Sequence, residues 1–297
     1  MAEVAAGAKS RRALEVGGDY LGLLKLRVVL LLDLTALGAM LPAARGLPRI
    51  EPVLAVLLGG SMAAGGAQAI NAWFDRDIDA VMARTRRRPL PSGRIPAWHA
   101  LLLGIVLNVA AFVILALLAN VVAALLALAG TLVYLFVYTF WLKRTTPQNI
   151  VIGGAAGAVP PLVGWAAVTG GLDWTAVSLF LVIFFWTPPH FWALARMMRR
   201  DYESARVPML PVVAGERPAK VWALAYATLA VAASVVPFFT RAAGAIYLGG
   251  ALLLGAGLLG ACVLDLAGRS SAKRVFGLAN VYLAALFALL AIGSVSL

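Results

Sequence analysis

Long apolar runs separated by short polar segments dominate the chain. Nine runs hold about twenty mostly apolar residues each, the length that an α-helix needs to cross the hydrocarbon core of a bilayer. They predict nine membrane-spanning helices at about 20–42, 52–72, 98–118, 121–141, 149–169, 175–197, 219–239, 244–265 and 275–296. Connections as short as Ala119-Asn120 indicate that neighbouring helices pair antiparallel. We therefore expect a polar N-terminal tail at 1–19, followed by a single membrane domain at 20–297.

Composition and charge support an all-α integral membrane protein. Of the 297 residues, 62% are hydrophobic and 13% are charged, which is more apolar surface than a soluble domain could bury. The net charge of +12 would suggest nucleic acid in a soluble protein, but here the basic residues gather in short loops. With the N-terminus in the cytoplasm, 22 of the 25 Lys and Arg residues lie inside, and only Arg45, Arg49 and Arg241 lie outside. The positive-inside rule therefore predicts a cytoplasmic N-terminus and an external C-terminus.

A polar stretch at 71–95 follows the second span. Asn71, Asp75 and Asp79 are four residues apart, so on a helix each step drifts by only about 40° and the three side chains share one face. Asp77 falls on the other side. Carboxylates this close repel each other unless a cation lies among them, and one or two carboxylates can hold Mg²⁺ together with substrate phosphate. The face predicts a magnesium site; the alternative is a solvated loop that only sets topology.

Basic side chains near this face could bind phosphate oxygens. Four of the six arginines in this stretch lie just after the face, at Arg84, Arg86, Arg87 and Arg88. A guanidinium group matches the geometry of phosphate. Lys143 and Arg144 close the fourth span, and for them a simple positive-inside anchor is an equal alternative.

A second polar stretch at 186–220 follows the sixth span and falls on the same predicted side. Its carboxylates include Asp201 and Glu203. Its cations include Arg196, Arg199, Arg200 and Arg206. Two acidic poles that face each other across a helix bundle could hold a diphosphate through Mg²⁺ ions.

His190 lies inside the sixth span, directly after Pro188 and Pro189, which we expect to bend the helix. An ionisable residue inside a span is a functional candidate by default. The alternative is a buried neutral histidine bonded to a carbonyl that the prolines free. His99, near a span end, is interpreted as structural, and the sequence identifies no partner for Asp33 inside the first span.

Small residues and the single cysteine suggest packing rather than chemistry. Gly153 and Gly157 lie four apart on the fifth span, and glycines also cluster at 59–66 in the second. Such residues let membrane helices approach closely. Cys262 is the only cysteine, so disulfides and thiol-based metal sites are excluded.

Several blocks resemble a known family. Asn71-x3-Asp75-x3-Asp79 at the end of the second span resembles the first aspartate motif of the UbiA-type intramembrane prenyltransferases. A more specific resemblance is to one branch, the protohaem IX farnesyltransferases or haem O synthases. It is carried by the blocks DRDIDAVMARTRRRPLPSG (75–93), YTFWLKRTTPQNIVIGGAAGAVPPLVGW (138–165), and WTPPHFWALARMMRRDY with VPMLPVV (186–213). It covers about 20–296 and implies a nine-helix bundle around a central cavity.

The resemblance also implies an activity and its residues. The activity would be Mg²⁺-dependent transfer of farnesyl from farnesyl diphosphate to the vinyl group of haem B, giving haem O for terminal oxidases. The implied catalytic and metal-binding residues are Asn71, Asp75, Asp79 and Asp201. The implied diphosphate contacts are Arg84, Arg88, Lys143 and Arg144. His190 is our candidate for a haem contact, because imidazole suits iron.

Two positions bear on the second motif of the resemblance. Ala205 stands where the general family has a second aspartate. The haem branch likewise has alanine there, which puts a symmetric second carboxylate site in doubt. Arg206 stands where the branch tends to have glycine. The resemblance further implies a bacterial cell membrane, surrounding lipid, and haem A synthase or oxidase-assembly partners.

Three other functions are compatible with parts of the pattern. A UbiA-type enzyme could use another acceptor, such as a quinone or chlorin precursor. A secondary transporter should show internal repeats, and we find none. A haem-binding chaperone would have no use for the acidic face.

Overall fold

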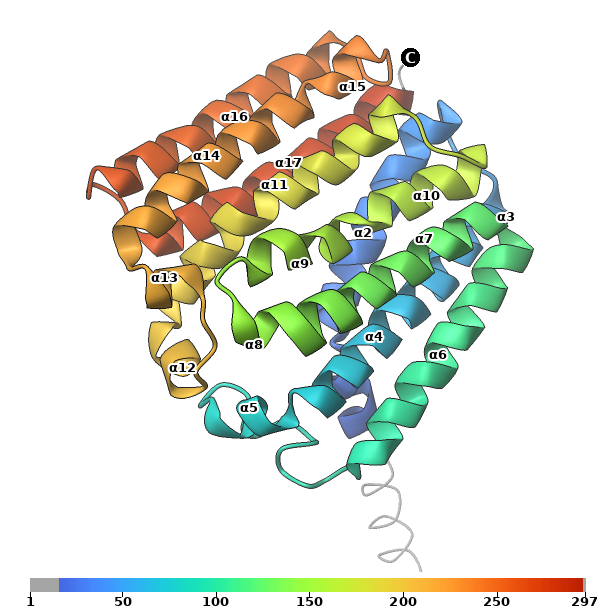
Figure 1. The fold of residues 1–297 in the computed structure, drawn as a ribbon. Helices are drawn as coiled ribbons and strands as arrows, with labels where there is room; N and C mark the ends of the chain where they lie inside the picture. The colour runs from blue at the N-terminus through green and yellow to red at the C-terminus, as the bar shows by residue number, and fades with distance from the viewer. Residues whose placement is uncertain (1–15, 296–297) are drawn as a thin grey trace, which may run out of the picture.

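The computed structural model describes residues 16–295, and all regular secondary structure in that range is helical (Figure 1). The α-helices are α2 (Leu26–Ala44), α3 (Ile50–Ala55), α4 (Ser61–Phe74), α5 (Arg76–Val81), α6 (Ala97–Leu118), α7 (Val121–Leu132), α8 (Lys143–Thr145), α9 (Asn149–Ala158), α10 (Pro160–Thr169), α11 (Trp174–Met197), α12 (Arg199–Ser204), α13 (Leu210–Val213), α14 (Glu216–Ser234), α15 (Val236–Phe239), α16 (Ala245–Leu266) and α17 (Ala272–Val295). Two π-helical segments, η1 (Val56–Gly60) and η2 (Val133–Leu142), continue α3 and α7. The expected all-α fold is confirmed.

Within the described residues, nine helical stretches are long and apolar enough to cross a membrane. They are Leu26–Ala44, Ile50–Phe74, Ala97–Leu118, Val121–Thr145, Asn149–Thr169, Trp174–Met197, Glu216–Phe239, Ala245–Leu266 and Ala272–Gly293. The predicted number of spans is confirmed, and most of the predicted ends agree within a few residues. Of the predicted tail, residues 1–15 lie outside the described range.

The first span begins later than expected because the chain changes direction at Lys25. Residues 16–24 are helical, but Lys25 takes the left-handed conformation with φ of 50°, which is uncommon for a residue with a Cβ. Its ammonium turns toward the second span and donates to Gln68 Oε1 at 2.7 Å. The span therefore starts at Leu26 rather than at residue 20.

Neighbours in the chain are mostly neighbours in space. α4 packs against α6, α11 lies between α9 and α14, and α16 packs against α14 and α17 (Figure 1). α2 contacts both α10 and α17, so the first span also packs against the last. This arrangement brings the two ends of the chain into one bundle.

Glycines allow some of the close helix crossings. A Cβ on Gly66 would lie 2.8 Å from the carbonyl oxygen of Gly104, so α4 and α6 touch through their backbones. A Cβ on Gly153 would lie 2.3 Å from the ring of Tyr138. Both agree with the expected packing role. Gly157 has nothing within 4 Å of the equivalent position, so the expectation of close packing was wrong there.

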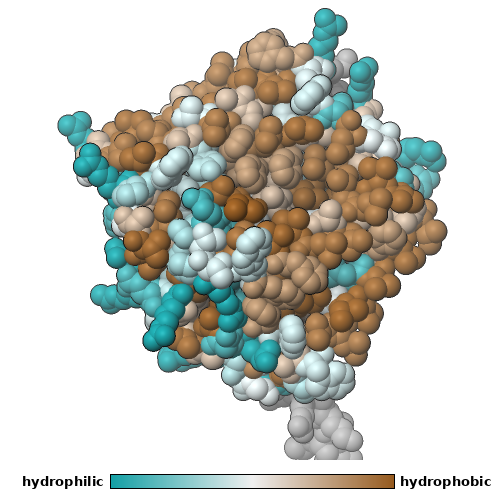
Figure 2. All heavy atoms as spheres, in the orientation of Figure 1, coloured by the Kyte–Doolittle hydropathy of each residue, from teal (hydrophilic) through white to brown (hydrophobic). Residues whose placement is uncertain are grey.

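The surface separates an apolar flank from a polar end. Figure 2 shows hydrophobic side chains over much of the visible flank and hydrophilic ones gathered at the lower left, around α5 and α12. α6 exposes Leu102, Val106 and Val109. Apolar surface of this extent is stable in contact with lipid and would be costly in water.

The two polar stretches found in the sequence meet at that end. Met82, after α5, packs with Tyr202 of α12 and with Val207 and Met209 of the following loop. Ile150 of α9 belongs to the same buried cluster. The loops after the second and sixth spans therefore lie together, as expected; their cytoplasmic location stays a prediction.

Candidate functional site

Asn71, Asp75 and Asp79 form a buried polar face at the polar end of the second span. α4 ends at Phe74, and Asp75 is a hinge residue with φ −85° and ψ 7° before α5 begins. The amide of Asp75 still donates to the carbonyl of Asn71 at 2.9 Å, and that of Asp79 to the carbonyl of Asp75 at 2.8 Å. Helical spacing thus persists across the break. Only 4%, 1% and 6% of the three residues are exposed, whereas Asp77 points outward.

Cationic side chains from other segments hold the two buried carboxylates. Lys143 Nζ contacts Asp75 Oδ2, and Arg144 Nη2 lies 3.4 Å from Asp75 Oδ1. Arg88 Nη1 lies 2.9 Å from Asp79 Oδ2. The structure therefore brings together three of the four basic residues that the resemblance implied as diphosphate contacts.

Arg144 also links the two sides of the acidic stretch. Its Nη1 and Nη2 atoms each lie 2.7 Å from a carboxylate oxygen of Asp77. These hydrogen bonds hold the pKa of Asp77 below its usual range. Its guanidinium lies over the ring of Phe74 at 4.6 Å, which adds an aromatic contact to its ion pairs.

Lys25 is a member of this site that the sequence did not reveal. It donates to Gln68 Oε1 at 2.7 Å and to Asn71 Oδ1 at 3.1 Å. Burial lowers the pKa of Lys25 to about 7, and the positive charges of Arg88 and Lys143 act in the same direction. An arriving anion would favour its protonated form. The signal in the sequence was a lysine near the start of the first predicted apolar run.

The π-helical segment η2 completes the wall of the site. Thr139 accepts a hydrogen bond from Asn71 Nδ2 at 3.2 Å, and the hydroxyl of Tyr134 donates to Gln68 at 3.1 Å. Lys143 Nζ lies 6.0 Å from the ring centre of Tyr138. Short π-helical segments often occur at functional sites because they shift side chains out of helical register. Here η2 places the hydroxyl of Thr139 against Asn71 of the acidic face.

The donor set of the acidic face fits Mg²⁺. No three His, Cys, Asp or Glu side chains between residues 16 and 295 lie close enough to hold a metal by themselves. Mg²⁺ does not require such a cage, since it keeps several waters and needs only one or two carboxylates beside substrate phosphate. Asp75 and Asp79 supply the carboxylates, and Asn71 supplies a neutral oxygen.

The second polar stretch contributes less than expected. Asp201 lies half-buried on α12, and no ion pair joins it to another described residue. Burial raises the pKa of Tyr202, its neighbour, while the positive charges of Arg84 and Lys143 oppose that rise. α12 therefore lies within electrostatic reach of both cations. Arg84 itself is exposed.

Two of the four cations named for that stretch pair with carboxylates outside the acidic face. Arg199 pairs with Glu203 at 2.6 Å on the surface of α12. Arg196 is directed away from the acidic face: its Nη1 lies 2.5 Å from Oδ2 of Asp265 on α16. Lys220 of α14 lies 3.7 Å from the same carboxylate. The interpretation of Arg196 as part of a diphosphate pole was wrong. It pairs instead with Asp265, a buried residue far along the chain that the sequence analysis did not single out.

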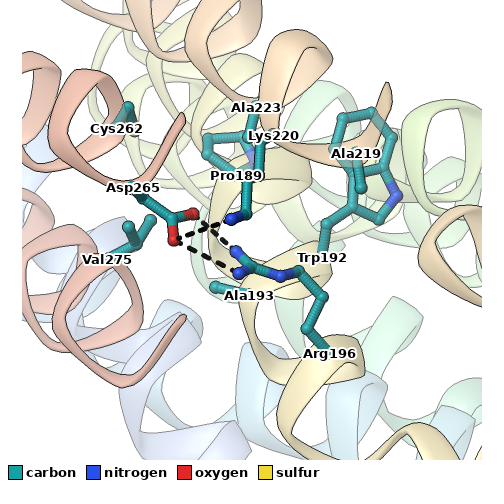
Figure 3. A pocket seen from close by; sticks show the side chains of 10 residues that line it. All are labelled: Pro189, Trp192, Ala193, Arg196, Ala219, Lys220, Ala223, Cys262, Asp265 and Val275. Atoms are coloured by element: carbon teal, nitrogen blue, oxygen red, sulfur yellow. Dashed lines mark hydrogen bonds and ion pairs between the residues drawn. The ribbon is translucent and has the colours of Figure 1, made fainter. Parts of the chain in front are cut away.

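Figure 3 shows this second cluster, where Arg196 and Lys220 converge on Asp265 beside a small cavity. The cavity is lined by Pro189, Trp192, Ala193, Arg196, Ala219, Lys220, Ala223, Cys262, Asp265 and Val275. None of the residues of the acidic face lines it. The cluster joins α11, α14 and α16 and is separate from the candidate site.

His190 is packed between aromatic rings. Its ring stacks on Trp186 at 4.3 Å and on Phe276 of α17 at 4.6 Å. Its Nδ1 is buried and has no hydrogen-bond partner among the described residues, so the alternative of a bond to a freed carbonyl is not seen at that atom. α11 continues as a helix through Pro188 and Pro189.

The two other unusual polar residues have local partners. His99 Nδ1 lies 2.5 Å from the hydroxyl of Tyr20, consistent with the expected structural role. Asp33 accepts a hydrogen bond from Ser61 at 2.5 Å, which identifies the partner that the sequence could not provide.

Comparisons with known proteins identify the family of this chain. The sequence matches the UbiA prenyltransferase family over residues 32–286. It is 50% identical over 277 residues to the protoheme IX farnesyltransferase of Symbiobacterium thermophilum, which covers 92% of this chain and 93% of that protein. It is also 50% identical over 289 residues to the enzyme of that name from Gloeobacter violaceus, covering 94% and 92%.

Among solved structures, that of digeranylgeranylglyceryl phosphate synthase superposes with a TM-score of 0.80 at 22% identity, covering 95% of this chain and 100% of the other. A UbiA homologue from Archaeoglobus fulgidus bound to DMAPP and Mg²⁺ gives 0.68 at 18% identity, covering 94% and 99%. At these identities the structures support the fold alone. Together with the nine apolar spans, the sequence match shows that this chain is an integral membrane protein of the UbiA prenyltransferase family.

Proposed function

We propose that this protein transfers the farnesyl group of farnesyl diphosphate to the vinyl group of haem B, with addition of water, to give haem O and diphosphate. The observation that carries the proposal is the buried Asn71, Asp75 and Asp79 face ringed by cations. It occurs in a chain that shares half of its residues with protoheme IX farnesyltransferases over nine-tenths of its length.

The acidic face and its cations would divide the work of binding the diphosphate. Asn71, Asp75 and Asp79 would hold Mg²⁺, and Asp201 would complete the metal site if α12 moves inward. When bound, Mg²⁺ supplies positive charge to the leaving oxygens. The diphosphate contacts would be Arg84, Arg88, Lys143 and Arg144. The last three pair with carboxylates in the structure, so substrate binding must redirect them.

The chemistry begins with cleavage of the allylic C–O bond, whose electron pair leaves with the diphosphate. Donors fixed in place stabilise that developing charge, which is the largest single contribution an enzyme usually makes. The vinyl group of haem then attacks the allylic carbon and forms the new C–C bond. Water adds to the resulting cation and loses a proton, which gives the hydroxyethylfarnesyl group. Burial of the site within the bundle limits early capture of the first cation by water.

His190 would contact the haem. It lies on α11 with one unpartnered ring nitrogen and two stacked aromatic neighbours. Histidine is a common axial ligand of haem iron. Because the acidic face and its cations would serve the diphosphate, the two substrates would bind to separate groups of residues.

The location proposed for the protein is the bacterial cell membrane, with the N-terminus in the cytoplasm and the C-terminus outside. It rests on the distribution of 22 of 25 basic residues to one side. Cysteines placed at the exposed positions Arg86 and Arg206 should resist an impermeant thiol reagent added to intact cells. Labelling of either position from outside would contradict this orientation. Partners in haem A synthesis or oxidase assembly stay predictions.

The activity is tested by adding haem B, farnesyl diphosphate and Mg²⁺ to membranes that contain the protein and identifying the haem product by mass. Haem that gains a farnesyl group and one water is the expected product. The same membranes supplied with a quinone precursor are the control. A prenylated quinone precursor together with unchanged haem would show that the acceptor is the quinone precursor and not haem.

A further inference from the structure

Three residues of the acidic face share an unusual feature. Asn71, Asp75 and Asp79 each have a side-chain oxygen in contact with a cationic side chain. The three contacts are Lys25 Nζ with Asn71 Oδ1 at 3.1 Å, Lys143 Nζ with Asp75 Oδ2, and Arg88 Nη1 with Asp79 Oδ2 at 2.9 Å. A divalent ion cannot take these oxygens while the cations stay in place, because like charges a few ångströms apart repel strongly away from bulk water.

Lys25 differs from the other two cations. Lys143 and Arg88 are paired with carboxylates, but Lys25 contacts only neutral amide oxygens, those of Gln68 and Asn71. No carboxylate of the described residues lies within ion-pair distance of its ammonium. A half-buried cation without an anion is costly. Lys25 is therefore the cation of the site that gains most from an incoming negative group.

The backbone at Lys25 is also unusual. Its left-handed conformation, with φ of 50°, carries strain for a residue with a Cβ, and such strain persists only where surrounding structure enforces it. The break ends the helix at 16–24 and starts α2. Its effect is to direct the ammonium across to α4, where Gln68 and Asn71 lie one turn apart.

We propose that Lys25 binds the diphosphate and that its exchange between Asn71 and diphosphate couples the binding of diphosphate to that of Mg²⁺. Mg²⁺ displaces the ammonium from Asn71 Oδ1, and the diphosphate accepts it. Mg²⁺ alone would leave the Lys25 ammonium with only the neutral oxygen of Gln68, whereas diphosphate bound with Mg²⁺ would give it an anionic partner. The inference rests on the proposed function in naming diphosphate as the substrate group and in assigning Mg²⁺ to the acidic face.

Coupling of this kind is reciprocal: each ligand tightens the other by the same factor, typically between about 5- and 150-fold. We expect a factor of about ten or more in the wild-type protein. Removing the ammonium should have opposite effects on the two ligands. Mg²⁺ alone loses a competitor and binds more tightly, while diphosphate in the presence of Mg²⁺ loses a partner and binds more weakly.

The experiment is calorimetric titration of the full-length protein in detergent with Mg²⁺ alone, with inorganic diphosphate alone, and with diphosphate at saturating Mg²⁺. Lys25→Met removes the charge and keeps most of the chain length. Lys25→Arg keeps the charge, and Lys273→Met removes a lysine from the exposed start of α17. Thermal unfolding of each variant identifies any that misfold.

Lys25→Met should tighten Mg²⁺ binding about threefold or more and weaken diphosphate binding at saturating Mg²⁺ about tenfold. Lys25→Arg should retain most of the coupling, and Lys273→Met should match the wild type. A Lys25→Met protein in which both affinities fall together, or neither changes, would overturn the proposal. Should Lys25→Met misfold, loss of coupling in a folded Lys25→Arg would also contradict it.

This outcome is independent of the acceptor. A wild-type protein that makes haem O but shows no coupling would reject only the role of Lys25. Coupling in a protein that leaves haem unchanged would reject only haem as the acceptor.

Discussion

Nη1 of Arg88 lies 2.9 Å from Oδ2 of Asp79, so a residue from the polar loop neutralises the last carboxylate of the acidic face. The loop is held there locally as well, since the hydroxyl of Thr85 donates to the carbonyl oxygen of Asp79 at 2.8 Å. Arg88 would thus have two partners in turn, Asp79 before substrate binds and the diphosphate afterwards.

Neutralising either buried carboxylate should abolish turnover. We expect Asp75→Asn and Asp79→Asn each to lower the rate of haem farnesylation at least about 100-fold, because a preorganised group that stabilises developing charge is usually worth that much. Asp19→Asn is the matched control, since Asp19 pairs with the exposed Arg94 outside the acidic face, and it should retain most of the activity. Product formation by mass spectrometry measures the effect.

The metal dependence can be tested on the same proteins. EDTA should stop the wild-type reaction, and added Mg²⁺ should restore it, because the diphosphate then regains its counter-charge. Wild-type turnover in Asp75→Asn or Asp79→Asn, or full activity in EDTA, would contradict the assignment of the acidic face to the metal.

Different substitutions should weaken the binding of the two substrates. We expect His190→Ala to weaken haem binding about tenfold or more and to leave farnesyl diphosphate affinity nearly unchanged, since loss of one good polar contact costs about that much. Arg88→Ala should do the reverse. Optical titration with haem and calorimetric titration with farnesyl diphosphate measure the two affinities. An unchanged haem spectrum and affinity in His190→Ala would make this residue an ordinary core histidine.

Asp265 should contribute to stability rather than to turnover. Asp265→Asn leaves the side chains of Arg196 and Lys220, which are 9% and 15% exposed, without their buried anion. Breaking a buried ion pair by removing one partner costs about 3–5 kcal/mol. We expect a clear fall in the unfolding temperature in detergent, with near-normal activity in the protein that remains folded.

Glu216 provides the comparison for Asp265. It contacts Arg196 at 3.3 Å, but its side chain is 53% exposed. Exposed ion pairs contribute about 0–1 kcal/mol, so Glu216→Gln should unfold at nearly the wild-type temperature. Equal losses from the two substitutions would show that burial of Asp265 is not the cause.

The crossing of α2 and α10 should not tolerate even one added methyl group. A Cβ on Gly164 would lie 2.1 Å from the carbonyl oxygen of Ala36, and a backbone atom cannot move aside as a flexible side chain can. We expect Gly164→Ala to destabilise the protein by about 1–3 kcal/mol. Gly157→Ala on the same span is the control, since nothing lies within 4 Å of its Cβ position. Thermal unfolding of both variants in detergent measures the difference.

The local pattern determined the features that depend only on neighbours in the chain. Hydrophobic run lengths predicted the nine spans, since a helix that crosses lipid must be apolar along its whole length. The four-residue spacing predicted that Asn71, Asp75 and Asp79 share a face, and the structure buries all three. That spacing survives the helix break at Asp75 because the backbone bonds continue across it.

Partner choice was decided by tertiary structure. The sequence grouped Arg196 with Asp201 because they are five residues apart, but helix packing brings Asp265 to Arg196 from far along the chain. Lys25 was counted among the topology-setting cations, and only its left-handed backbone and the approach of α4 bring it to Asn71. Charges interact through space, so the partner of a buried charge depends on how the helices pack, which periodicity within one helix does not encode.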